Sequence, residues 1–81
     1  MKTNINIPLS NLPIGTNGKV IALTAKGSVR RRMLDLGFVQ NTHVLAVRKS
    51  PAGDPIAYKV RGAIVALRKE EASNILIEQF V

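Results

Sequence analysis

Short stretches in which apolar and polar residues alternate cover much of this chain and predict a mainly β structure. In residues 55–60, for example, Ile56, Tyr58 and Val60 fall on one face of an extended strand, whereas Ala57 and Lys59 fall on the other. Strands are expected over residues 19–25, 42–49, 55–60, 63–67 and 75–80.

Residues 4–14, which precede the first expected strand, are predicted to be an irregular lead-in. Four apolar side chains are expected to anchor it to the core: Ile7, Leu9, Leu12 and Ile14. A short turn is expected at Ser10-Asn11, and Gly15 and Gly18 are expected to mark a loop.

Residues 28–36 show a helical period. Val29, Met33 and Leu36 form one apolar stripe, and Ser28 is a suitable N-cap because its hydroxyl can accept a hydrogen bond from a free backbone N–H. Arg31 and Asp35 are four residues apart and are expected to form an ion pair across one helical turn.

The sequence also predicts where this helix ends. Gly37 is expected to adopt the left-handed conformation and Phe38 to fold back onto the core. A second, short helical turn is expected over residues 69–74, with Glu70 and Glu71 near its N-terminus.

The segment Gly53-Asp54-Pro55 predicts a tight reversal between two strands, because glycine permits unusual backbone angles and proline fixes its own. Five short strands joined by tight turns, with a helix between the first two, predict a small, partly open β-barrel. A chain of 81 residues has the length of one domain, residues 1–81.

The amino-acid composition limits the kinds of site and partner that this protein can have. The chain has no cysteine, which excludes disulfides and thiolate metal sites, and it has no apolar run long enough to cross a membrane. Residues 1–10 lack an apolar stretch of signal-peptide length, so a cytoplasmic protein is expected. The net charge of +7 favours acidic partners, such as nucleic acid, anionic lipid or an acidic protein face.

Several short motifs occur together in a defined order: Gly18-x-Val20, Arg32-x-Leu34-x-Leu36-Gly37-Phe38, Gly53-Asp54-Pro55 and Tyr58-x-Val60-Arg61-Gly62. Each motif is unspecific, but the ordered set, which runs from about residue 9 to residue 77, resembles the FeoA family of bacterial ferrous-iron transport proteins. One departure is Gln40-Asn41, where the family commonly has Pro-Gly. Asparagine tolerates the left-handed conformation, so the turn is expected to survive.

The resemblance implies an SH3-like β-barrel and a small cytosolic accessory protein of FeoB, a membrane transporter of ferrous iron with a cytosolic G domain. It implies that the protein is recruited to the inner face of the membrane by that partner. A related SH3-like domain forms the C-terminus of iron-dependent repressors of the diphtheria-toxin-repressor type. A regulatory, nucleic-acid-binding role is therefore the alternative.

Candidate residues for metal binding and catalysis are sparse. His43 is the only histidine, and the carboxylates show no ligand spacing, so no metal or cofactor site is expected. Glu70 and Glu71 are adjacent in an expected helix and would point about 100° apart, so they cannot act as an acid–base pair. No catalytic residue is therefore assigned, and the protein is not expected to be an enzyme.

Binding of a protein partner is the function that the residues favour. Nucleic-acid binding is less favoured because the chain has only three aromatic residues, and Phe38 and Phe80 are better explained as core. The candidate contact residues lie on the helix, at the Gly53–Pro55 turn and on the outward face of the following strand: Arg30, Arg31, Arg32, Asp54, Pro55, Lys59 and Arg61.

Overall fold

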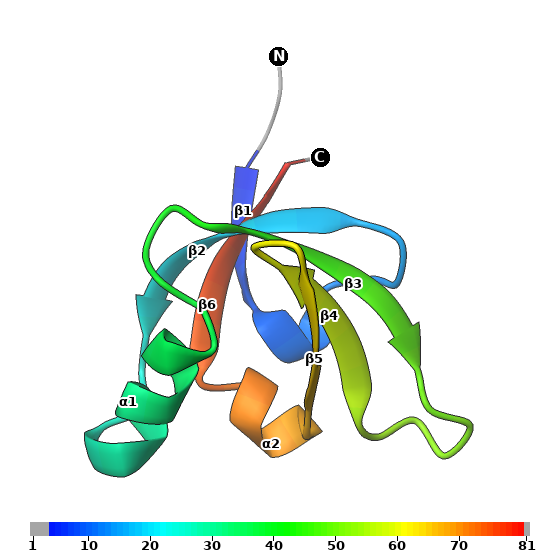
Figure 1. Ribbon diagram of the computed structural model, residues 1–81. Coiled ribbons are helices and arrows are strands. Elements are labelled where there is room, and N and C mark those ends of the chain that lie inside the picture. Colours follow the sequence, from blue (N-terminus) through cyan, green and yellow to red (C-terminus); the bar gives the residue numbers. More distant parts are fainter. Residues whose placement is uncertain (1–3, 81) are drawn as a thin grey trace.

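A computed structural model describes residues 4–80 and shows one antiparallel sheet that curls into an open barrel (Figure 1). Six strands follow the order β1-β6-β2-β3-β4-β5, so β1 and β5 are the two edges and the sheet does not close. The strands are β1 (Asn4–Pro8), β2 (Asn17–Leu23), β3 (His43–Lys49), β4 (Ile56–Val60), β5 (Ala63–Leu67) and β6 (Ile75–Phe80). The expected partly open barrel is thereby confirmed.

The expected irregular lead-in is wrong, because its first part is strand β1. This strand pairs along its whole length with β6, with Ile7 opposite Ile77, and the short 3-10 helix Leu9–Asn11 follows it. Leu9 and Leu12 are buried as expected, but Ile14 is 40% exposed. The segment becomes a strand because β6, from the other end of the chain, supplies its hydrogen-bonding partner.

Gly18 was expected in a loop but lies within β2, next to β6. A Cβ atom at this position would stand 2.5 Å from Cδ1 of Ile77 and 3.3 Å from the backbone oxygen of Glu78. Glycine is therefore required by the close approach of the neighbouring strand rather than by a turn. Gly15 does lie in a turn, with a φ of 87°.

Helix α1 (Gly27–Asp35) ends as the sequence predicts. Gly37 has a φ of 107°, its N–H donates to the carbonyl of Leu34 at 3.0 Å, and the N–H of Phe38 donates to the carbonyl of Met33 at 3.1 Å. This pair of bonds is the Schellman arrangement, and it brings Phe38 into the core with no exposed surface.

The other end of α1 differs from expectation. Ser28 is inside the helix, Lys26 occupies the N-cap position, and no side chain caps the first turn. Val29 is 42% exposed and Leu36 is only partly buried, so Met33 alone of the expected stripe is fully buried. The stripe fails because only the C-terminal part of this short helix covers the core.

The second helix, α2 (Lys69–Ala72), confirms the expected helical turn, with Glu70 and Glu71 in its first turn. Figure 1 shows α1, α2 and the loop between β3 and β4 at the same end of the barrel, away from the start of β1 and the end of β6. Neither helix of residues 4–80 is long and apolar enough to cross a bilayer.

Among the side chains that the structure describes, one polar group lies in the core. Tyr58 on β4 is fully buried, and its hydroxyl donates to the carbonyl of Leu9 at 3.4 Å. Burial, with a smaller contribution from the negative charge of Asp54, raises the pKa of Tyr58 to about 12. The placement of Ile56, Tyr58 and Val60 on the inner face is confirmed.

Candidate protein-binding surface

The seven candidate contact residues lie on three separate segments of the chain. They occupy helix α1, the loop between β3 and β4, and β4 with the turn that follows it: Arg30, Arg31 and Arg32, then Asp54 and Pro55, then Lys59 and Arg61. The arginines, Lys59 and Arg61 are exposed, whereas Asp54 and Pro55 are half-buried.

The three arginines of α1 have different surroundings. Arg30 donates from Nη1 to the carbonyl of Leu23 at 3.2 Å, and Arg32 forms an ion pair with Glu71 of α2. The expected ion pair between Arg31 and Asp35 is not found among the ion pairs of residues 4–80. An exposed helical pair of this kind gains little energy, so the two side chains remain solvated.

Asp54 is a structural residue. Its Oδ1 accepts a hydrogen bond from the backbone N–H of Lys69 at 2.8 Å, and its Oδ2 lies 3.9 Å from Nη1 of Arg68. The loop that carries it is held by Ser50, whose hydroxyl donates to the carbonyl of Asp54 at 2.7 Å. The expected reversal between two strands is confirmed, since this loop joins β3 to β4.

Helix α2 joins two of the candidate groups. Its N-terminus is capped by Asp54, and Glu71 both accepts the N–H of Arg68 at 3.0 Å and pairs with Arg32 of α1. Sequence reasoning missed this connection, because it depends on three segments that meet only in the fold. The presence of an acidic residue at the third position of the helix was the one available signal.

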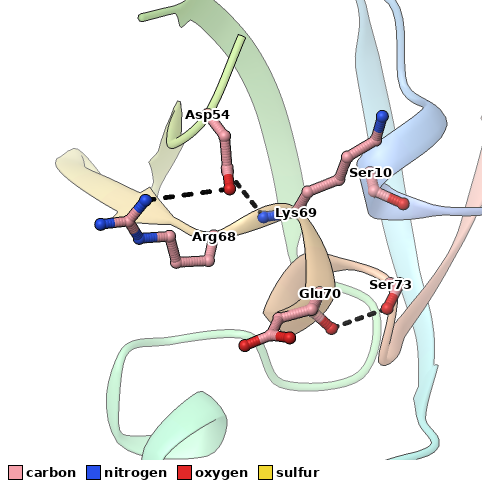
Figure 2. Close-up of a pocket in the computed structure, with 6 residues that line it drawn as sticks. All are labelled: Ser10, Asp54, Arg68, Lys69, Glu70 and Ser73. Atoms are coloured by element: carbon pink, nitrogen blue, oxygen red, sulfur yellow. Dashed lines mark hydrogen bonds and ion pairs between the residues drawn. The ribbon is translucent and has the colours of Figure 1, made fainter. Parts of the chain in front are cut away.

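An open cleft of about 710 Å³ lies beside α2 and contains residues that sequence reasoning did not select (Figure 2). Besides Asp54, its lining consists of Ser10, Arg68, Lys69, Glu70 and Ser73. Several of these polar groups already form hydrogen bonds within the protein. The Ser73 hydroxyl, for example, donates a hydrogen bond of 2.6 Å to the carbonyl of Glu70. The cleft is open to solvent, and its lining groups Asp54, Arg68 and Ser73 are engaged in hydrogen bonds or ion pairs within the protein.

Lys59 and Arg61 lie near the open edge of the sheet. Lys59 is on the outer face of β4, opposite Leu45 of β3 and Ile64 of β5. Arg61 occupies the turn between β4 and β5 with a φ of 52°, and its aliphatic part packs over Gly37, where a Cβ atom would stand 3.1 Å from Cδ of Arg61. A glycine at position 37 therefore permits the left-handed end of α1 and also leaves room for the Arg61 side chain.

Asn41 confirms the expected survival of the turn after α1. It has a φ of 72°, and its N–H donates to the carbonyl of Val20 at 2.8 Å.

His43 is exposed at the start of β3. Within residues 4–80, no three histidine or carboxylate side chains lie together in a way that could hold a metal ion.

Solved structures of similar proteins share this fold. A FeoA-like protein from Clostridium acetobutylicum is 40% identical, with a TM-score of 0.84 over 91% of this chain and 86% of that one. The FeoA of Stenotrophomonas maltophilia, solved with zinc, is 32% identical, with a TM-score of 0.77 over 88% of this chain and 93% of that one. The latter is described as a prokaryotic SH3 domain protein, so the expected SH3-like fold is confirmed.

A curated relative connects the domain to a transporter. The chain is 33% identical over 70 residues to the Fe(2+) transport protein A/Fe(2+) transporter FeoB fusion protein of Porphyromonas gingivalis. The match covers 86% of this chain but only 8% of that much longer protein. The family model for the FeoA domain matches residues 7–79, and the chain therefore belongs to the FeoA family, which is linked to ferrous-iron transport.

Proposed function

We propose that this protein is a non-enzymatic accessory of ferrous-iron transport, which binds a FeoB-type membrane transporter through its cytosolic part and modulates it. The observation that carries the proposal is the fusion protein of Porphyromonas gingivalis, in which the two activities named for it share one polypeptide. A fused domain is always present at high local concentration. A separate chain must achieve the same proximity by binding.

The charge distribution supports an acidic partner face. Of the five acidic residues, three form ion pairs within the protein: Asp54 with Arg68, Glu71 with Arg32, and Glu78 with Lys19. Arg31 on α1 and Arg61 in the turn after β4 are exposed and take part in no ion pair within residues 4–80, although the carboxylate of Asp35 also lies on α1. Such a surface speeds association with an acidic protein face.

The alternative, a nucleic-acid-binding regulator, has less support. Single-strand binders stack bases on exposed aromatic rings. The two aromatic side chains that the structure describes, Phe38 and Tyr58, are both fully buried. Any nucleic-acid binding should therefore be blind to sequence and should weaken steeply with salt. A sequence-selective complex at physiological salt would favour the regulatory role instead.

The test is binding to a full-length FeoB-type transporter in detergent and to its isolated G domain. Co-purification or a titration followed by mass photometry should detect a complex with at least one of them. The proposed place of action is the inner face of the membrane, so vesicles that contain the transporter should retain the protein, whereas empty vesicles of the same lipids should not. If the folded transporter binds in neither form, the proposal is wrong.

A further inference from the structure

Strand β5 (Ala63–Leu67) forms an unprotected edge of the sheet. Only β4 pairs with it, and its five residues include no charge and no proline, the residue types with which proteins usually protect an edge. Ala63, Ile64 and Ala66 are exposed. Ile64, at 61%, is the most exposed large apolar side chain in the part of the chain that the structure describes.

The register of β5 identifies the backbone groups that face outward. Val60 pairs with Ala63 across the two-residue turn, and in such a hairpin the closing pair is hydrogen-bonded. Hydrogen-bonded pairs then alternate, so Ala63, Val65 and Leu67 bond to β4. The N–H and C=O groups of Ile64 and Ala66 therefore point away from β4, and no hydrogen bond to them is found within residues 4–80.

We infer that this edge receives an extended segment of the transporter, which adds to the sheet as a further strand beside β5. The added strand would satisfy the outward groups of Ile64 and Ala66 and would cover the Ile64 side chain. This inference rests on the proposed function and specifies the contact that the partner makes.

The charges around β5 define the chemistry of the incoming segment. Lys59 stands opposite Ile64 on the outer face, and Arg61 is in the turn at the start of β5. Both are exposed, and neither takes part in an ion pair within the described residues. A segment that places an apolar residue over Ile64 and acidic residues beside these two cations is therefore complementary.

A second copy of this chain is a poor occupant of the same edge. Antiparallel pairing of two β5 strands that joins Ile64 of one copy to Ala66 of the other places Arg61 opposite Lys69 and Gly62 opposite Arg68. Cations of the two copies would meet at both ends of the contact. These residues lie just outside the strand, in the turn before β5 and at the start of α2. Their like charges would repel, in addition to the repulsion between two chains of charge +7.

Hydrogen exchange distinguishes strand addition from other modes of binding. The chain is incubated in deuterated buffer alone and with the full-length transporter in detergent, and uptake is measured by mass spectrometry with residue-level fragmentation. The amides of Ile64 and Ala66 should exchange quickly in the free chain and become protected in the complex. Those of Ala63, Val65 and Leu67, already bonded to β4, should change less.

Three variants test the same contact by affinity. Ala66→Pro removes an outward N–H without removing a bond to β4, and Ile64→Glu puts a negative charge where an acidic segment would lie. Ile14→Glu is the matched control, because Ile14 is also exposed and apolar but lies in the loop before β2, outside the candidate contact groups. The first two should weaken binding roughly tenfold or more, whereas the control should change it less than about threefold. Thermal melts show whether each variant remains folded.

The outcomes separate the two proposals. Transporter binding with no added protection at Ile64 and Ala66 would overturn the β5 contact and leave the proposed function intact, as would a folded Ile64→Glu variant that binds like the parent. No binding by the parent chain would overturn both. A concentration-dependent dimer that protects β5 in the chain alone would identify a second copy as the occupant.

Discussion

The carboxylate of Asp54 accepts a hydrogen bond from the backbone N–H of Lys69 at 2.8 Å, which ties the loop between β3 and β4 to the first residue of α2. A helix as short as α2 has no stability of its own in water. Its first turn is held by Asp54 from outside and by Glu71 from within. The Gly53–Pro55 segment therefore acts as a helix cap for a distant element, beyond its role as a turn.

Asp54→Ala should lower the free energy of unfolding by about 1 kcal/mol, the usual cost of losing an N-terminal cap. Asp54→Asn should cost less, because the amide oxygen can still accept the hydrogen bond from Lys69. Urea denaturation followed by circular dichroism measures both. Asp35→Ala is a control for removal of an exposed carboxylate, since Asp35 takes part in no ion pair within residues 4–80. Equal free energies of unfolding for Asp54→Ala and the parent would contradict the capping role.

Met33→Ala should cost about 2–5 kcal/mol, because Met33 is fully buried and the substitution leaves a cavity. The sequence pattern gave Leu36 equal importance, but Leu36 is only partly buried, so Leu36→Ala should cost less. Chemical denaturation of the two variants, measured side by side, shows which substitution lowers the free energy of unfolding more. A larger loss for Leu36→Ala would mean that α1 packs with a different face toward the core.

Arg31→Ala should leave the free energy of unfolding within about 0.5 kcal/mol of the parent, since Arg31 is exposed and forms no ion pair within the described residues. Its loss should slow association with the transporter at low salt, because an unpaired cation of this kind acts mainly by steering. Stopped-flow association at two salt concentrations measures the effect. A faster dissociation rate would instead place Arg31 inside the contact.

Stability should fall as the pH rises through the range in which Tyr58 ionises. The folded protein holds the pKa of Tyr58 at about 12, above the ordinary value of 10.0. The contribution of the neutral phenol is therefore fully present below pH 10 and is lost as the pH rises toward 12. Because Tyr58 is the only tyrosine, phenolate absorbance reports on it directly. Tyr58→Phe should show a smaller loss of stability than the parent over the same range.

Titration of the isolated protein with Fe²⁺ under anaerobic conditions, or with Mn²⁺ in its place, should reveal no tight stoichiometric site. The reason is the lack of clustered histidine and carboxylate ligands in residues 4–80. Calorimetry and amide chemical shifts are the measurements. His43→Ala controls for weak binding by a single exposed imidazole, and a site of micromolar or tighter affinity would contradict the prediction.

Local chemistry made part of the structure predictable. The end of α1 is encoded in Leu36-Gly37-Phe38, because only a residue tolerant of positive φ followed by an apolar residue satisfies the last carbonyl groups in this way. The inner face of β4 is equally visible in the alternation of Ile56, Tyr58 and Val60. In both cases the physical cause lies in neighbouring residues, so a short stretch of sequence is enough to reveal it.

Most of the local elements, the basic character and the family of this protein can be inferred from its sequence. Its other features depend on contacts between distant segments. Strand β1 exists because β6 pairs with it, Gly18 is required because Ile77 lies against it, and Arg32 and Asp54 are linked because α2 lies between them. Only the strand order showed that β5 has one partner instead of two. Backbone pairing and contacts between distant segments depend on which surfaces the folded chain brings together, and a pattern read along one strand carries no information about its neighbours.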